Sequence, residues 1–137
     1  MSSVPHVTHK AGVILTPWTD VSSVLHTAIT LASGTCGWPI VITCGTEGHG
    51  PTDPHTRGAA RDIHTLDWTP LQILQTVAAL QLALHQVVPG IRFTVLYESA
   101  ARPVDSQLAA MYYANPGASA PHIHVQLAIG EVYPPVG

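Results

Sequence analysis

The sequence predicts an α+β domain in which helices pack on one face of a mainly antiparallel sheet. Two segments combine helix-capping residues with apolar residues at helical spacing, and four segments have the apolar runs or the alternation of strands. A long excursion separates the last two strands, which allows them to pair antiparallel. At 137 residues the chain is long enough for one hydrophobic core, so we expect a single domain over residues 1–137.

The first helix is expected at residues 21–33. Thr19 or Asp20 can cap its N-terminus, and Gly34 follows its last periodic residue. The apolar run at residues 39–44 then predicts a buried strand, because it is short, rich in β-branched residues and closed by a glycine.

The segment after this strand has the composition of a loop. Residues 46–58 mix Gly, Pro, Asp, Thr and His, and long loops in compact domains are often functional. A short strand is expected at residues 60–64. A second helix is expected at residues 71–88, with Thr69 as its cap and Pro70 at its first position.

The C-terminal part is expected to contain two more strands, at residues 91–98 and 122–129. Residues 99–121, between them, are a mostly irregular excursion with one or two helical turns near residues 106–113. This gives the order α-β-β-α-β-excursion-β, with the last two strands placed to pair antiparallel.

Side-chain alternation puts polar residues of these two strands on a shared face. His122, His124 and Gln126 share one face of the last strand, and Glu98 lies on the polar face of the strand before it. With antiparallel pairing, the end of one strand at Glu98 meets the start of the other. A carboxylate and two imidazoles are therefore expected to gather at one corner of the sheet.

A metal site is predicted from His55, Asp62 and His124. Two imidazoles and a carboxylate suit zinc, and three protein ligands leave an open position for water, as in catalytic zinc sites. We therefore expect one Zn²⁺ per chain and a metallohydrolase. His49, in the loop before the motif, is an alternative ligand.

Such a site needs a base that is not itself a ligand, to take a proton from water and pass it to the leaving amine. The chain has three glutamates. Glu131 lies roughly 23 Å beyond His124 along an extended strand, which excludes it. Glu47 stays open as a candidate, and strand alternation favours Glu98.

The spaced motif around these residues resembles that of a known family. It consists of His55, Gly58, Ala60 and Asp62, followed by His122, His124 and Val125. The pattern resembles the zinc D-alanyl-D-alanine peptidases, which share their fold with the hedgehog signalling domain. The resemblance covers about residues 39–129 and implies that His55, Asp62 and His124 bind zinc. Tyr97-Glu98-Ser99 looks like the segment that carries the catalytic Glu of that family.

One difference from the family concerns the excursion. In the family the catalytic Glu lies only a few residues before the final His pair, whereas here residues 100–121 intervene. Antiparallel pairing accommodates such an insertion as a longer loop at the metal-site end. The insertion is therefore a candidate wall or lid for the substrate.

The resemblance implies a peptidoglycan substrate, a short stem peptide that contains D-amino acids. An Arg that grips the terminal carboxylate would favour carboxypeptidase action, and the same guanidinium could instead polarise the scissile carbonyl. Arg57 is the first candidate and Arg102 the second. By alternation Arg61 should point away from the side of Asp62. His122 is expected to contact the substrate or to support the ligands.

Composition excludes several partners and leaves one alternative function. The net charge is −3 with only five Lys and Arg, which argues against nucleic acid as a partner. The chain has no polybasic segment and no run of about 18 apolar residues, so we expect no membrane insertion. Residues 1–17 lack the basic and apolar regions of a signal peptide. The alternative to a peptidase is a non-catalytic zinc-binding recognition module of the hedgehog type.

The two cysteines, Cys36 and Cys44, are not expected to form a disulfide. The segment between them reads as extended, which would separate their Cα atoms by roughly 26 Å. A disulfide needs about 4.4–6.8 Å. We expect two unbridged thiols that are at least half-buried.

Overall fold

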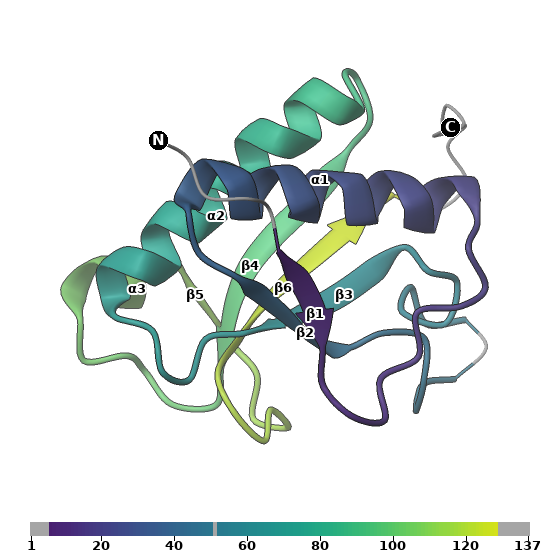
Figure 1. The fold of residues 1–137 in the computed structure, drawn as a ribbon. Helices are drawn as coiled ribbons and strands as arrows, with labels where there is room; N and C mark the ends of the chain where they lie inside the picture. The colour runs from purple at the N-terminus through teal and green to yellow at the C-terminus, as the bar shows by residue number, and fades with distance from the viewer. Residues whose placement is uncertain (1–5, 51, 129–137) are drawn as a thin grey trace.

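The fold is α+β, with three helices and a six-stranded mixed sheet in the part of the chain that the structure describes (Figure 1). The structure is a computed structural model that describes residues 6–50 and 52–128. Its elements in chain order are β1 (Val7–His9), α1 (Asp20–Cys36), β2 (Ile40–Cys44), β3 (Ala60–His64), α2 (Pro70–Val87), β4 (Phe93–Ser99), α3 (Ser106–Met111), β5 (Tyr112–Ala114) and β6 (His122–Leu127).

The strand order in the sheet is β1-β2-β3-β6-β4-β5. The four central strands pair antiparallel, β2 with β3, β3 with β6 and β6 with β4. Both edge strands pair parallel, β1 with β2 and β5 with β4. The predicted antiparallel arrangement therefore fits the centre of the sheet, and the two short edge strands make the whole sheet mixed.

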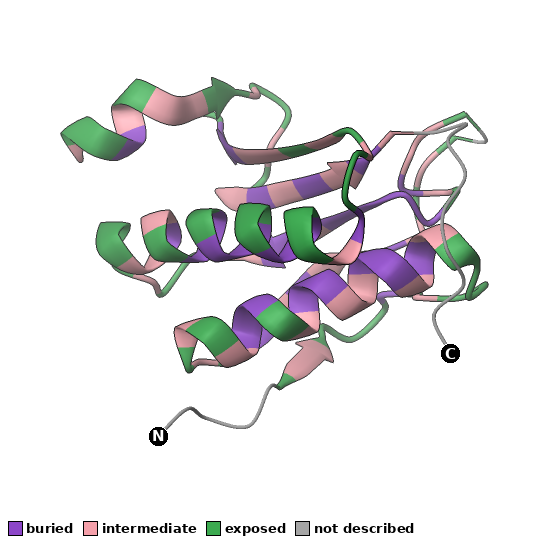
Figure 2. Cartoon of the chain, turned by 90° about the horizontal axis from the view of Figure 1, so that it is seen from above, coloured by how far each residue is buried: buried purple, intermediate pink, exposed green. Residues whose placement is uncertain are grey.

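Helices α1 and α2 lie side by side over one face of the sheet (Figure 1). Seen from the helix side, their buried residues face each other and the sheet, while their outer surfaces are exposed (Figure 2). The fully buried side chains of this layer include Leu25 and Ile29 of α1, Leu80 and Leu84 of α2, and Ile63 and Ile123 of the sheet. Each contributes about 1.5–3 kcal/mol by leaving water. The opposite face of the sheet is left for the functional site.

The ends of α1 are set by local hydrogen bonds. Thr19 caps the N-terminus in a reciprocal arrangement with Ser22. The predicted end at Gly34 is wrong, because the helix continues through it to Cys36. Gly37 ends the helix instead: its φ of 83° suits glycine, and its N–H donates to the Ser33 carbonyl.

The other elements lie close to their expected positions. Strand β3 has the predicted bounds, and α2 has Thr69 as N-cap and Pro70 in its first turn. Strand β4 begins at Phe93, two residues later than predicted, and the excursion forms α3 and then β5. Strand β6 ends at Leu127, and the predicted end at residue 129 lies outside the described residues.

One charged side chain lies on the helix-facing side of the sheet. Arg61 of β3 is 1% exposed, and its Nη1 donates a 2.7 Å hydrogen bond to His26 Nδ1 of α1. Its guanidinium lies 5.1 Å from the centre of the Trp18 ring, and its Nη2 has no hydrogen-bond partner within the described chain. Burial lowers the pKa of Arg61 to about 10. As predicted, this arginine points away from the face that carries Asp62.

Candidate metal centre

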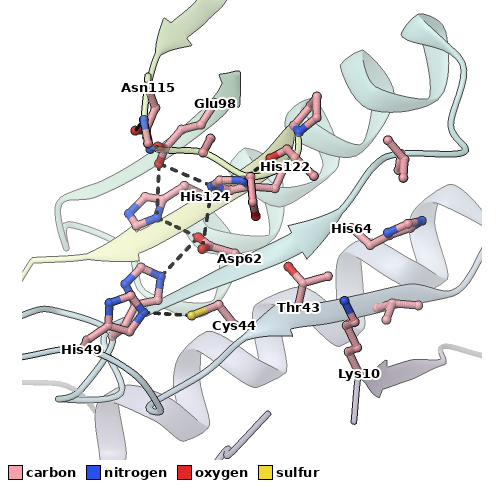
Figure 3. Close-up of a pocket in the computed structure, with 18 of the residues that line it drawn as sticks. Lys10, Thr43, Cys44, His49, Asp62, His64, Glu98, Asn115, His122 and His124 are labelled. Carbon is pink, nitrogen blue, oxygen red and sulfur yellow. Dashed lines mark hydrogen bonds and ion pairs between the residues drawn. The ribbon is translucent and has the colours of Figure 1, made fainter. Parts of the chain in front are cut away.

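The centre of the site is one oxygen atom of Asp62. Asp62 Oδ1 accepts a 3.2 Å hydrogen bond from His55 Nε2 and a 3.0 Å hydrogen bond from His124 Nδ1 (Figure 3). Asp62 and His124 are direct partners across β3 and β6, which places their side chains on the same face. The structure therefore brings together the three predicted ligands, and these three residues form a group that could hold a metal ion.

His55 reaches the site from a loop that is fixed by its neighbours. Asp53 Oδ1 accepts hydrogen bonds from the backbone N–H of His55 at 2.8 Å and from its Nδ1 at 3.0 Å. The loop turns back at Gly58, whose φ is 75° and whose N–H donates to the His55 carbonyl. A Cβ at Gly58 would lie 2.9 Å from Ser22 Cβ of α1. The motif glycine thus allows the loop to pass close to the helix.

The donor atoms of the three residues lie close enough together for one metal ion. Asp62 Oδ1 lies 3.2 Å from His55 Nε2 and 3.0 Å from His124 Nδ1, and all three donor atoms lie within 4.8 Å of one another. The second nitrogen of each ring is held by an oxygen, His55 Nδ1 by Asp53 and His124 Nε2 by Gln126 Oε1 at 2.9 Å. Such outer hydrogen bonds are typical of metal-binding histidines.

The three groups form an ion-pair cluster when no metal is bound. Burial alone would raise the pKa of Asp62, but hydrogen bonds from His124 and His55 outweigh it and hold that pKa well below its usual range. Burial alone would lower the pKa of both imidazoles, and their hydrogen bonds to Asp62 raise it instead. Hydrogen bonds to one carboxylate oxygen thus draw the two rings together around the position that a cation would take.

Glu98 lies beside the cluster without belonging to the ligand group. It is 8% exposed, and its partner across β4 and β6 is His122, as the alternation predicts. Its Oε2 accepts a 2.6 Å hydrogen bond from Asn115 Nδ2, from the segment after β5. Its Oε1 faces the site, 3.5 Å from His124 Nδ1 and 3.9 Å from His122 Nε2.

His122 points into the same space from the end of β6. Its Nδ1 donates a 3.0 Å hydrogen bond to the carbonyl of Ala120. Its Nε2 therefore faces the cluster, 3.7 Å from Asp62 Oδ2. The predicted supporting position of this imidazole agrees with the geometry.

Three other candidates do not lie at the site. Arg57 and Arg102 are exposed, and neither lines the groove over the cluster. The Glu47 carboxylate accepts hydrogen bonds from the backbone N–H groups of Ile14 and Gly45 at 2.8 and 3.0 Å. Its position ties the N-terminal loop to the end of β2, away from the groove lining, which removes the geometric case for Glu47 as the base.

A groove of about 890 Å³ runs over this face of the sheet from the cluster. Residues 117–121 of the excursion form one wall, as expected for the insertion. Lys10 and His64 lie away from the cluster along the groove (Figure 3). Lys10 is the only lysine or arginine that lines the groove within the described ranges. The groove thus combines a polar cluster with room for an extended ligand.

Two further residues lie at the site although the sequence does not assign them to it. Asn115 lies seventeen positions from Glu98, and no local pattern marks their contact. Cys44 was interpreted only as a half-buried thiol, yet its Sγ lies 2.9 Å from His49 Nε2. The spacing Cys44-x-x-x-x-His49 at a strand-to-loop junction was the available signal.

Comparisons with known proteins supply no family for this chain. No family model matches it, and no curated protein or solved structure matches it either. Within residues 6–50 and 52–128, no helix has the length and apolar character needed to cross a bilayer. The functional argument therefore rests on the geometry of the cluster and its groove.

Proposed function

We propose that this protein is a zinc-dependent metallopeptidase that hydrolyses the stem peptides of peptidoglycan. His55, Asp62 and His124 would hold the zinc ion, and Glu98 would transfer the proton. The observation that carries the proposal is the position of Glu98. Its Oε1 lies 3.5 Å from His124 Nδ1, yet the carboxylate is outside the group of three ligands.

Each residue around the cluster has a distinct part in this proposal. Zinc supplies Lewis-acid polarisation of the reacting oxygen. Glu98 Oε1 accepts the proton of the attacking water and returns it to the nitrogen of the leaving amine. Asn115 holds Oε2, so that Oε1 keeps its direction toward the site. His122 donates from Nδ1 to the Ala120 carbonyl, so its Nε2 faces the groove as an acceptor and can orient a bound water or a substrate N–H.

The peptidoglycan substrate is supported by the motif resemblance and by the form of the groove. An open groove with a wall made by residues 117–121 suits an extended peptide better than a compact ligand. Two bonds fit the proposal, the D-Ala-D-Ala bond of a carboxypeptidase and the L-Ala-D-Glu bond of an endopeptidase. Mass spectrometry of digested muropeptides distinguishes them, because the first releases free D-alanine and the second splits the stem.

The test compares wild type with Glu98→Gln, which keeps the shape of the side chain and removes its basicity. We expect about one zinc per chain in both proteins by elemental analysis, and loss of turnover of about 10²–10⁴-fold in the variant. Glu47→Gln is the matched control and should keep its turnover. Wild type without stoichiometric zinc, or an active Glu98→Gln, overturns the proposal. Bound zinc with no turnover in wild type favours the recognition module instead.

A further inference from the structure

Beside the candidate metal centre, the carboxylate of Asp53 orients the imidazoles of both His49 and His55. The rings of His49 and His55 stack with centroids 4.3 Å apart and planes only 11° from parallel. Asp53 faces the same atom of both rings, with Oδ1 3.0 Å from His55 Nδ1 and Oδ2 3.6 Å from His49 Nδ1. The Nε2 atoms of both rings therefore point away from Asp53, toward strands β2 and β3.

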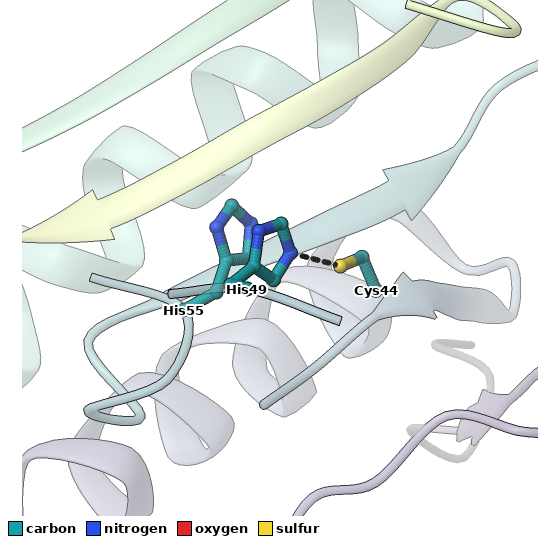
Figure 4. Close-up of side chains that lie close together, drawn as sticks. All are labelled: Cys44, His49 and His55. Carbon is teal, nitrogen blue, oxygen red and sulfur yellow. Dashed lines mark hydrogen bonds between the residues drawn. The ribbon is translucent and has the colours of Figure 1, made fainter. Parts of the chain in front are cut away.

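The two Nε2 atoms meet two different ligand types on these strands. Cys44 of β2 and Asp62 of β3 are direct partners across the sheet. His55 Nε2 meets Asp62, and His49 Nε2 lies 2.9 Å from Cys44 Sγ (Figure 4). Cys44 is a free, half-buried thiol that also lines the groove. One ligand atom each from Cys44, His49 and His55 lies within 4.8 Å of the others.

We propose that Cys44, His49 and His55 form a second cation site, selective for thiophilic ions of the zinc, cadmium and copper(I) class. Thiolate and imidazole together favour such ions over magnesium or calcium. The proton of His49 lies on Nδ1, toward Asp53, so Nε2 presents its lone pair to the thiol. When the ion binds, the Cys44 S–H bond breaks and His55 Nε2 loses the proton that it donates to Asp62. Both protons go to solvent, and the ion gains one sulfur–metal and two nitrogen–metal bonds.

The second site shares a ligand with the first. Because His55 donates its Nδ1 proton to Asp53, only Nε2 is free to bind a metal ion. One lone pair cannot serve two ions, so each site has its full set of three ligands only when the other lacks His55. A thiophilic ion at Cys44 therefore withdraws His55 from Asp62 and His124. The proposal goes beyond the peptidase function, since neither Cys44 nor His49 takes part in the reaction described above.

The test uses Cd²⁺ as the probe, because a thiolate ligand gives a sulfur-to-cadmium charge-transfer band in the ultraviolet. Metal-free wild type titrated with Cd²⁺ should show this band, saturating near one equivalent. Cys44→Ser should abolish the band, and His49→Gln should weaken Cd²⁺ binding by about tenfold or more. Cys36→Ser is the matched control and should keep the band. Cys36 is the other free cysteine, and it lies at the C-terminal end of α1, outside the groove.

Several results would overturn the second site. These are a wild type without the band, a band that survives Cys44→Ser, and a band that is lost in Cys36→Ser. His124→Gln removes a ligand of the first site only, so loss of the band there would assign the thiol to that site. This test is independent of the peptidase test, because it measures Cd²⁺ binding by the Cys44 thiol and does not measure turnover.

A measurement on wild type covers the case in which Cys44→Ser does not fold. Cd²⁺ should slow the alkylation of Cys44 by iodoacetamide, followed by mass spectrometry, and leave the rate at Cys36 unchanged in the same sample. Equal rates at Cys44 with and without Cd²⁺ would contradict the proposal.

Discussion

Asn115 Nδ2 donates a 2.6 Å hydrogen bond to Glu98 Oε2, which ties the segment after β5 to the end of β4. Replacing Asn115 by alanine should lower kcat about 10- to 100-fold, because a hydrogen bond to a charged group is worth about 1.5–3 kcal/mol. The zinc content should stay unchanged, since Asn115 does not contact the ligand group. Steady-state kinetics on a purified muropeptide, with zinc analysis of the same sample, make this measurement.

A second alanine variant on the same wall controls for general damage to the groove. Ser119 lines the groove close to Asn115 in sequence. Ser119→Ala should keep kcat within about twofold of wild type, as most surface substitutions are nearly neutral. An equal loss of kcat in both variants would mean that the wall matters as a whole and that Asn115 has no specific hold on Glu98.

Zinc binding should release protons, and more of them at low pH. Burial lowers the pKa of His55 and His124, but their hydrogen bonds to Asp62 outweigh it and raise the pKa above the usual value of about 6.5. Below that pH both rings are protonated and compete with the metal, so zinc affinity should rise with pH until both protons are lost. Calorimetry in buffers of different ionisation enthalpy should show roughly two protons released per zinc near pH 6 and fewer at pH 8. Proton release that does not change with pH would contradict the cluster.

His26 should make the fold less stable in mild acid. Burial and the neighbouring Arg61 guanidinium, in that order, hold the pKa of His26 below its usual value. The unfolded chain therefore binds a proton more readily than the folded one, so this contribution is complete above about pH 6.5 and falls as pH drops toward the folded pKa. Between pH 7.5 and pH 5, the free energy of unfolding measured in urea should fall less in His26→Gln than in wild type. His85→Gln, on the exposed side of α2, should follow wild type.

Gly58 and Gly48 offer a matched pair for the turn that carries His55. Their φ values are 75° and 76°, but a Cβ at Gly58 meets Ser22 at 2.9 Å, whereas nothing lies within 4 Å of one at Gly48. Gly48→Ala should cost about 1–2 kcal/mol from the left-handed backbone alone. Gly58→Ala should cost about 1–3 kcal/mol more from crowding against α1. Equal free energies of unfolding would show that the contact with α1 relaxes without cost.

Under the proposed peptidase function, we expect Lys10 and not Arg57 to recognise a substrate carboxylate. Lys10 lines the groove, and Arg57 is exposed outside it. For a peptide with a free C-terminus, Lys10→Met should raise KM about 3- to 10-fold through loss of a charge-assisted contact. Arg57→Ala should leave KM nearly unchanged. For the same peptide with an amidated C-terminus, wild type and Lys10→Met should have the same KM. A difference in KM for the amide would show that Lys10 has another role.

Local patterns predict the part of the site that is built on regular strands. Alternation along β4 and β6 places Glu98 opposite His122 because the side-chain period of a strand is fixed and one face of this sheet is buried. The caps Thr19 and Thr69 follow from hydrogen bonds within a single turn of helix. Such features depend on neighbours in sequence, so one chain contains enough information for them.

The features that the sequence did not reveal depend on distant partners. Strands β1 and β5 have three residues each and exist because β2 and β4 offer free edges. The positions of Arg57 and of His49, the partner of Cys44, depend on how the loop between β2 and β3 folds, and composition does not determine such a path. Gly34 lies inside α1, and the backbone becomes left-handed only at Gly37; the presence of a glycine does not show which of these conformations it adopts.

Ligands and core residues alternate along the central strands, and this restricts which changes in chain length the protein can tolerate. Asp62 faces the groove between two neighbours, Arg61 and Ile63, that face the helices. Deleting one residue of β3 or β6 would exchange the two sets and place a carboxylate or imidazole in the core. Within the excursion, β5 and Asn115 are held against β4, whereas the turns at residues 100–105 and 116–121 have no such alternation. Homologous chains should therefore keep the lengths of the central strands fixed and vary in these turns, so that the wall of the groove can change while Asp62 and His124 stay on one face.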